Sequence, residues 1–495
     1  MLRGPEARLR LISLMLVTVL LPIVGKLLQL QVLEHSLHAQ EAKELVEREY
    51  RLPDPPWGCI QDRHGDLLVG NQPLYDVGAE IQALIDPADV VEAAAKLAPL
   101  LGRPVAEVLD DLTPNEAERD NAIIWRILAK NVPTETAEEL KALIEEEGYL
   151  WITLLPTWSR YYAEGDLAAH TLGFVNARGL GFGIEAYWSR FLRGGQVVGE
   201  GPTTGFSEPT VEELATGQTM PYAGTDLRLT LDRTIQAYVE GELDKALEEY
   251  SAESGAILVL NPRTGEILAL ATRPSYNPAR YAEHYEAGEQ AIFQNPVISV
   301  PYEPGSVFKV VTIASVLDSG RVDLNWTYDD TGSLEYGGIV VYNSDREAHG
   351  RQGVQGILAR SSNVGAATLT TQILGAETFY NYVQAFGFGQ KTGVELSGEN
   401  AGTVHMSRDW DWEDSNLATN AFGQGIAVTP MQMAAAVSAI ANDGVLMQPY
   451  IVAERHYPDG RSVLVPPREV MRPISAETAQ TVSELMARAL EERMP

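Results

Sequence analysis

Lys309 is surrounded in the sequence by apolar residues such as Phe308, Val310 and Val311, and this is the strongest constraint that the sequence sets on its own fold. The segment reads SVPYEPGSVFKVVTIASVLDSG over residues 299–320 and predicts a helix with apolar neighbours on every side. Burying an unpartnered ammonium in such a helix is strongly unfavourable. The lysine must therefore be paired with polar groups, be deprotonated, or take part in a reaction.

Ser306 lies three residues before Lys309, so the two side chains share one face of the predicted helix. Pro304 and Gly305 interrupt the chain just before it, which places the serine in the first turn, where a helix favours developing negative charge. A lysine stripped of water can be neutral near pH 7 and can act as the base that activates a serine. The pair is a candidate nucleophile and base. The alternative is a chance serine beside a snorkelling surface lysine.

A second polar group follows in the sequence LARSSNVGAATL. Ser361 and Asn363 alternate with Ser362, so a turn or an extended loop would point both the same way. A hydroxyl can relay a proton to a leaving amine, and an amide can hold a peptide backbone by donating and accepting hydrogen bonds. The simpler interpretation is an ordinary helix N-cap before VGAATLTTQIL, and the two interpretations are compatible.

The N-terminal sequence LISLMLVTVLLPIVG, residues 11–25, has no charged residue. Further leucines extend it past Lys26, so with that lysine snorkelling it reaches the roughly 20 residues that a membrane span needs. Arginines precede the run and glutamates follow it, which predicts that the first ten residues are cytoplasmic and the remainder lies outside. A cleaved signal peptide is the rival interpretation, but no A-x-A site closes the run. We therefore expect a retained single-pass anchor.

The remainder of the chain has two regions with different sequence patterns. Before residue 220, short strand-like and helical pieces alternate, and the helices DVVEAAAKLAPLLG and TETAEELKALIEEEG each end at a glycine that can cap them. After Thr225, a long amphipathic helix precedes the hairpin signal GAILVLNPRTGEILALAT. Both predicted strands are apolar on both faces, so helices should cover the sheet on each side, and the Lys309 segment is one candidate. The expected segments are a cytoplasmic tail (1–10), the anchor (11–30), a polar stalk (31–56), an N-terminal pedestal (57–220) and a second domain (221–495).

Composition excludes several functions. The formal net charge of −31 argues against a nucleic-acid-binding protein, which needs a basic surface. Cys59 is the only cysteine, so no intrachain disulfide can form, and a zinc site would have to rely on histidine and carboxylates.

Together, YEPGSVFK, SSNVGAA and FGQGIAVTPMQM resemble the transpeptidase domain of class B penicillin-binding proteins, the enzymes that cross-link bacterial cell walls. LTLDRTIQ and NPRTGEILALATRPSYNPARY are similar to the entry to that domain, and GCIQDRHGDLLVGNQPLYDV is similar to the family's pedestal. The resemblance covers nearly the whole chain and implies an α+β multidomain fold: an anchor helix, an α/β pedestal, and an antiparallel sheet flanked by helices. One departure is Trp57 before Gly58, where the family usually has arginine; it is expected to alter pedestal packing.

By this resemblance, Ser306 is the acylated nucleophile, Lys309 its base, Ser361 a proton relay, and Asn363 the residue that holds the donor stem peptide. The reaction would be acyl transfer from a D-alanyl-D-alanine stem to an amine, without metal or organic cofactor, and β-lactams would trap the serine. The implied partners are peptidoglycan stem peptides, the plasma membrane, a membrane glycosyltransferase and other cell-wall or division proteins. SSNVGAA, FGFGQKTG and FGQGIAVTP favour the septal branch over the elongation branch.

The family's third motif is Lys-Thr-Gly (or Lys-Ser-Gly) on a strand that faces the nucleophile. Lys391-Thr392-Gly393 matches these letters, but it leads into the turn-rich VELSGENAG, and we expect a loop without a catalytic role. The strand-borne motif is expected after a helix like SAETAQTVSELMARALEE, where this sequence ends at Pro495. The resemblance thus predicts a C-terminally incomplete domain that acylates at least ~10²-fold more slowly than a completed one, because one oxyanion donor is missing.

Two other classes of function stay open. A non-catalytic, membrane-anchored scaffold of a cell-wall synthesis complex, or an inactive fragment, fits the expected loss of the third motif. A β-lactamase or a penicillin sensor is a further alternative, against which the long pedestal argues.

Overall fold

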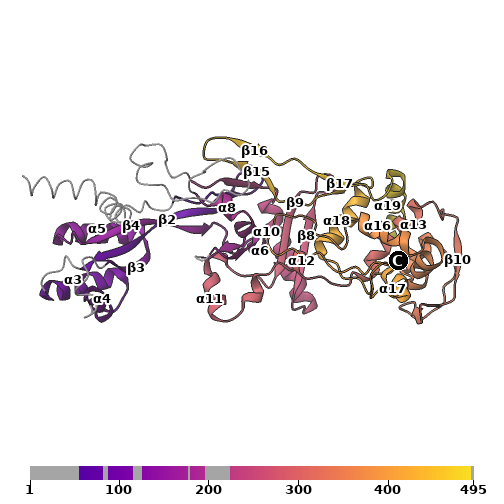
Figure 1. The fold of residues 1–495 in the computed structure, drawn as a ribbon, viewed down its shortest axis with the longest axis horizontal. Helices are drawn as coiled ribbons and strands as arrows, with labels where there is room; N and C mark the ends of the chain where they lie inside the picture. Colours follow the sequence, from indigo (N-terminus) through magenta and orange to yellow (C-terminus); the bar gives the residue numbers. More distant parts are fainter. Residues whose placement is uncertain (1–54, 82–86, 115–124, 177–178, 195–222, 492–495) are drawn as a thin grey trace, which may run out of the picture. The chain divides into compact units, whose positions relative to one another are not determined.

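The computed structural model describes residues 55–81, 87–114, 125–176, 179–194 and 223–491 (Figure 1). The expected cytoplasmic tail and anchor, and the stalk up to residue 54, lie outside these ranges. Within the described ranges, no helix combines the length and the apolar character that crossing a membrane requires.

The described residues form two compact units, each built from more than one stretch of the chain. Unit 1 contains residues 75–157, and unit 2 contains residues 56–74, 158–194 and 223–491. Two of the changes of unit, after Leu74 and after Thr157, fall inside long strands, β2 (Leu67–Glu80) and β4 (Ile152–Tyr162). The expected boundary near residue 220 lies outside the described residues and stays a prediction.

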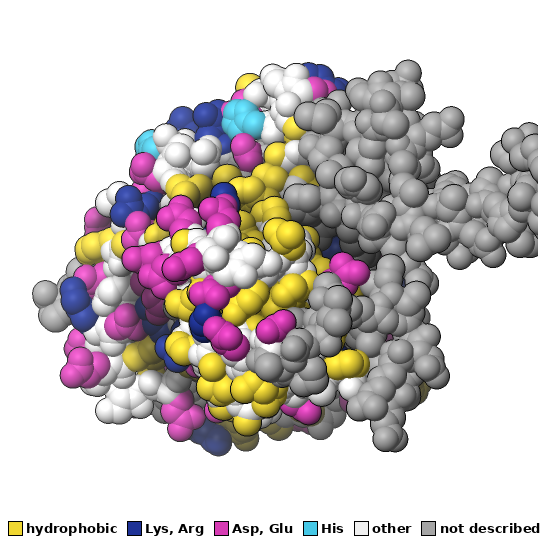
Figure 2. Space-filling model, turned by 90° about the vertical axis from the view of Figure 1, so that its left-hand side faces the viewer, with side chains coloured by type: hydrophobic (Ala, Val, Ile, Leu, Met, Phe, Trp, Pro, Cys, Tyr) yellow, Lys and Arg dark blue, Asp and Glu magenta, His cyan; other side chains and the backbone are white. Residues whose placement is uncertain are grey.

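In unit 1, helices pack against strands and share one hydrophobic core with them. Its strand β3 (Trp125–Pro133) pairs with β2, and both contribute to a core with the helices α3 (Pro87–Leu101), α4 (Val105–Leu112) and α5 (Thr134–Glu147). Both predicted amphipathic helices are confirmed: α3 is followed by Gly102 at φ 63° and α5 ends at Gly148 at φ 70°, a left-handed conformation that suits glycine. Acidic side chains are prominent on the face shown in Figure 2, as the net charge leads one to expect.

Unit 2 begins with a sheet built from distant parts of the chain. Its strands run in the order β16 (Ser462–Leu464), β15 (Val452–His456), β7 (Asp226–Leu229), β1 (Ile60–Gln61) and β2. Next to β1, the Trp57 ring lies 5.6 Å from the Arg160 guanidinium carbon and 5.1 Å from that of Arg193. The tryptophan that departs from the family pattern therefore packs against two cations.

The predicted hairpin is confirmed as the antiparallel pair β8 (Gly255–Leu260) and β9 (Ile267–Arg273). Helices do contact it, namely α10 (Arg233–Tyr250), α12 (Pro296–Ser299) and α18 (Pro430–Ala441). The Lys309 helix, α13 (Lys309–Asp318), packs mainly against other helices instead. Hydrophobic periodicity showed that this helix is buried, but it does not tell which element buries it.

The hydrophobic core around α13 is formed mainly by helices. Every residue of α13 from Lys309 to Val316 is buried, as the sequence indicated. The neighbours that share this core are α14 (Val354–Arg360), α16 (Ala376–Ala385), α18 and α19 (Ala476–Glu491). α13 is thus held on all sides, and its first residue has little freedom to move.

Candidate active site

The candidate nucleophile lies in a 3₁₀ turn, Gly305–Phe308, that leads directly into α13. Residues three apart eclipse each other in a 3₁₀ turn, so Ser306 and Lys309 share one face, as their spacing predicted. Ser306 is exposed, whereas Lys309 is only 1% exposed. The serine is therefore accessible to a substrate, and the amine beside it is shielded from bulk water.

Two glycines fix this turn from the side. The Gly305 N–H donates to the carbonyl oxygen of Gly423 at 3.0 Å. A Cβ built on Gly423 would lie 2.3 Å from the Gly305 oxygen, so no larger residue fits there without moving the turn. The segment AFGQGIAV, which the sequence offered only as a family likeness, thus abuts the nucleophile turn.

The Lys309 amine lies among polar atoms that come from two segments of the chain. Its Nζ is 3.2 Å from Ser306 Oγ, 2.9 Å from Ser361 Oγ, 2.5 Å from the Ser361 carbonyl oxygen and 2.8 Å from Asn363 Oδ1. All four of these partners are uncharged. The structure therefore brings the four predicted site residues into one hydrogen-bonded group.

The identity of these acceptors constrains the proton of the lysine. The Ser361 carbonyl oxygen and Asn363 Oδ1 can only accept hydrogen bonds, whereas the two hydroxyls can donate or accept. A neutral amine has two N–H groups and one lone pair. If the two N–H groups point at the two obligate acceptors, the lone pair faces the hydroxyls. This arrangement allows Lys309 to accept a proton from Ser306.

The turn that carries the other two residues joins α14 to α15 (Asn363–Thr368). Ser361 has φ 56° and ψ 43°, a left-handed conformation that is uncommon for a residue other than glycine. Ser361 and Asn363 both face Lys309, while Ser362 points away and accepts from Gly365 N at 2.9 Å as the N-cap of α15. The N-cap interpretation therefore holds for Ser362, and the shared direction of its two neighbours is confirmed.

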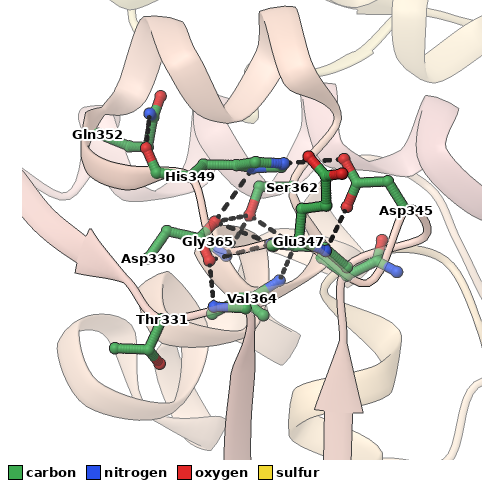
Figure 3. Close-up of polar contacts among 12 residues, drawn as sticks. Asp330, Thr331, Asp345, Glu347, His349, Gln352, Ser362, Val364 and Gly365 are labelled. Atoms are coloured by element: carbon green, nitrogen blue, oxygen red, sulfur yellow. Dashed lines mark hydrogen bonds and ion pairs between the residues drawn. The ribbon is translucent and has the colours of Figure 1, made fainter.

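Sequence reasoning missed a buried polar network behind this turn (Figure 3). At its centre is Asp330, the last residue of β10 (Thr327–Asp330), whose side chain is fully buried. Asp330 Oδ2 accepts from Ser362 Oγ at 2.8 Å and from Tyr328 OH at 3.0 Å, and Oδ1 accepts from Asn343 Nδ2 at 3.0 Å. The only local signal was the turn-like sequence DDTG, which gives no hint of a partner beyond residue 340.

The charge of Asp330 is stabilised by these donors. Burial by itself would raise the pKa of its carboxyl, but hydrogen bonds from Gly332 N, Ser362, Asn343 and Tyr328 outweigh burial and hold the pKa below its usual value. His349 lies beside the group, with Nδ1 3.4 Å from Asp330 Oδ2. Within the part of the chain that the structure describes, no group of three or more His, Cys, Asp or Glu side chains is arranged to hold a metal ion.

Lys391-Thr392-Gly393 lies in a loop, as predicted, and not on a strand. Glu399 organises this loop, because its carboxylate accepts from Gly393 N at 3.1 Å and from both the backbone and the hydroxyl of Thr392. The adjoining Val394 belongs to the core cluster that includes β1 and β7, not to the cluster around α13. The absence of a catalytic role for Lys391 stays a prediction.

Comparison with known families assigns both parts of the chain. Residues 255–493 match the penicillin-binding protein transpeptidase domain, and residues 53–200 match the penicillin-binding protein dimerisation domain. The first match includes the segments that carry Ser306, Lys309, Ser361 and Asn363. The second includes most of the expected pedestal.

Individual relatives agree with this assignment. Stage V sporulation protein D of Bacillus subtilis is 33% identical, over 81% of this chain and 60% of its own length, and the probable peptidoglycan D,D-transpeptidase PenA of Neisseria meningitidis is 31% identical, over 89% and 72%. The crystal structure of penicillin-binding protein 3 of Mycobacterium tuberculosis, complexed with aztreonam, matches with a TM-score of 0.62 and 26% identity, over 88% of this chain and 74% of that one. The chain thus spans less than two thirds of the first of these relatives. By its two domains, its relatives and its fold, this chain belongs to the class B penicillin-binding proteins.

Proposed function

We propose that this protein is a serine D,D-transpeptidase that cross-links peptidoglycan stem peptides through an acyl-enzyme at Ser306. The observation that carries the proposal is the environment of Lys309: a buried amine, 3.2 Å from an exposed serine hydroxyl, with two carbonyl acceptors for its own N–H groups. Names among the relatives, such as peptidoglycan D,D-transpeptidase, support the same reaction.

In the first half of the proposed reaction, Ser306 attacks the carbonyl carbon of the donor's D-alanyl-D-alanine peptide bond. Its hydroxyl proton passes to Lys309 Nζ as the new C–O bond forms. The C–N bond then breaks, and the departing D-alanine amine takes a proton through Ser361, whose Oγ lies 2.9 Å from Nζ. The products are an ester on Ser306 and free D-alanine.

In the second half, an amine of a neighbouring stem peptide attacks this ester. The amine loses a proton to the Lys309–Ser361 pair, and the Ser306 oxygen leaves and is reprotonated. Asn363 Nδ2 donates to the Tyr342 carbonyl oxygen at 3.1 Å while Oδ1 faces the lysine. In this proposal the amide both orients the base and lies where a stem-peptide backbone can contact it.

We place the bulk of the chain outside the bacterial plasma membrane, attached by the apolar segment 11–30, because basic residues precede that segment and acidic residues follow it. A membrane glycosyltransferase and division proteins are the proposed partners, in a septal role. β-Lactams are the proposed inhibitors, since a relative of this fold has been crystallised with aztreonam.

The test uses a fluorescent penicillin and a synthetic donor–acceptor peptide pair. We expect stoichiometric labelling that persists on the timescale of an acyl-enzyme, and D-alanine release that depends on the acceptor amine. Absence of labelling by the folded protein would support a scaffold and contradict the proposal. Rapid hydrolysis of the penicillin with repeated turnover would indicate a β-lactamase and would also contradict it.

A further inference from the structure

We infer that Asp330 is a positioning residue for this reaction: it fixes the turn Ser361–Asn363 from behind and, through that turn, orients Lys309. The inference rests on the proposed function, but it concerns residues that neither the motifs nor the sequence analysis singled out. Asp330 acts through Ser362 and Asn343.

The first step is the attachment of Asp330 itself. Its carboxylate is fixed by a backbone donor, Gly332 N, at 2.9 Å, and its strand β10 is paired in register with β13 (Gly350–Gly353). The side chain has no solvent exposure, so water cannot replace a lost partner without rearrangement. Asp330 is therefore a fixed point on the sheet behind the turn.

The second step links this fixed point to α15. Ser362 Oγ, 2.8 Å from Asp330 Oδ2, accepts from Gly365 N at 2.9 Å. Asn343, whose Nδ2 donates to Asp330, accepts from Val364 N at 3.2 Å through Oδ1. Two of the backbone N–H groups in the first turn of α15 are thus held by side chains that Asp330 orients. Figure 3 shows Asp330, Ser362, Val364 and Gly365 gathered in this network.

The third step connects the turn to the base. Ser361 has a left-handed conformation, which a serine keeps only when its surroundings hold it there. The Ser361 carbonyl oxygen and Asn363 Oδ1 are the two obligate acceptors of Lys309, and Ser362 lies between them in the chain. If Ser362 loses its support, both acceptors shift together. A displacement of about 1 Å at a reacting group can slow an enzyme by about 10²-fold.

The inference is tested with two variants and one matched control. Asp330→Ala removes every acceptor, and we expect penicillin to acylate Ser306 about 10²-fold more slowly. Asp330→Asn keeps the shape and one acceptor oxygen, so it should fold more readily and recover part of this loss. The control is Glu185→Gln, because Glu185 is also fully buried in unit 2 and accepts from Tyr162 OH at 2.9 Å, and Tyr162 belongs to the core cluster of β1 and β7 and not to the cluster around α13. Its acylation rate should stay within about threefold of wild type, as expected for a distant site.

A double-mutant cycle separates positioning from general loss of stability. If Asp330 acts through the turn, Asp330→Asn should have a much smaller effect on acylation in a protein that already carries Asn363→Ala. Additive effects of the two changes, or a wild-type acylation rate in Asp330→Ala, would overturn the inference.

Hydrogen exchange provides a readout that does not depend on activity. The Val364 and Gly365 amides should exchange faster in Asp330→Asn and unchanged in Glu185→Gln. If the wild-type protein is not acylated at all, the proposed function fails, and this exchange experiment still decides the inference: unchanged protection of both amides in Asp330→Asn contradicts it.

Discussion

Two lysines of this chain, Lys309 and Lys391, each lie close to a hydroxyl residue, but they differ in burial and in what the neighbouring hydroxyl contacts. Lys309 begins a buried helix, and its amine meets the Ser306 and Ser361 hydroxyls. Lys391 is exposed in a loop, and the backbone N–H and the hydroxyl of the neighbouring Thr392 both donate to the Glu399 carboxylate. A three-residue motif such as Lys-Thr-Gly therefore says less about the role of its lysine than the helix or loop in which the lysine lies.

The difference lies in what orients each group. Around Lys309, two fixed carbonyl acceptors leave the lone pair of a neutral amine facing hydroxyls. Around Thr392 and Gly393, the Glu399 carboxylate accepts the donors of the loop and fixes its backbone. The first arrangement permits proton transfer to and from a serine. The second stabilises a turn. Four experiments test this difference.

The largest effect is expected at Lys309. Lys309→Met keeps an unbranched side chain of similar length in the core but removes the amine, so Ser306 loses its proposed base. Acylation by penicillin should slow by about 10²–10⁴-fold, the range for loss of a general base. The measurement is a time course of labelling, with circular dichroism to confirm folding. A folded variant that loses only a few-fold would remove Lys309 from the mechanism.

A smaller effect is expected at Ser361. Ser361→Gly removes the hydroxyl 2.9 Å from the amine, and glycine adopts the φ of 56° without strain. Acylation should slow by about 10²-fold if the hydroxyl relays protons. Ser251→Gly is the matched control, because Ser251 is another left-handed serine, at φ 51°, at the end of α10. Equal rates in both variants would contradict the relay.

Lys391 should matter little. Lys391→Ala removes an exposed side chain from a loop that Glu399 holds by Thr392 and Gly393, so acylation should stay within a few-fold of wild type, as for most surface changes. The rate is compared with that of Lys245→Ala, which removes another exposed lysine. A selective loss of about 10²-fold or more at Lys391, with folding intact, would show that this Lys-Thr-Gly segment serves the reaction.

The smallest effect concerns stability beside the same loop. Burial raises the pKa of Glu395, although hydrogen bonds from Ile451 N and Val452 N partly offset it. A raised carboxyl pKa means that its contribution to stability is present below the unfolded value of about 4.3 and is lost as pH rises through the folded value. Glu395→Gln should therefore match wild type near pH 4 and exceed it near pH 7. Since about 1 kcal/mol moves the Tm of a large domain by roughly 2–4 °C, the gain should be a few degrees at most.

Thermal melts of both proteins across this pH range check the prediction for Glu395. Penicillin acylation at pH 7 is the control and should not change. A variant that is less stable than wild type at pH 7 would show that the charged carboxylate is required by the two backbone donors.

Local patterns in the sequence were sufficient for part of this site. The three-residue spacing of Ser306 and Lys309 and the alternation of Ser361, Ser362 and Asn363 are short-range features, and helices and turns convert them directly into shared directions. The β8–β9 hairpin was predicted for the same reason, since its turn residues lie between its own strands.

Long-range features could not be predicted in this way. Asp330 and Ser362 are 32 positions apart and meet through tertiary packing, and the sequence of neither segment predicts the hydrogen bond between them. The sequence also failed to show that α13 packs among helices, because apolar periodicity reports burial and not the identity of the neighbour. The pairing of β1 with β7 was not predicted either, because the two strands are far apart in the chain and neither sequence identifies its partner.

The central claim is that Ser306 is the residue acylated, and mass spectrometry after exposure to a β-lactam tests it most directly. We expect that the intact protein gains the mass of one β-lactam, that peptide mapping places the adduct on Ser306, and that Ser306→Ala gains no mass. A normal adduct on the folded Ser306→Ala variant, or an adduct mapped to another residue of the wild-type protein, would contradict the assignment of Ser306 as the nucleophile.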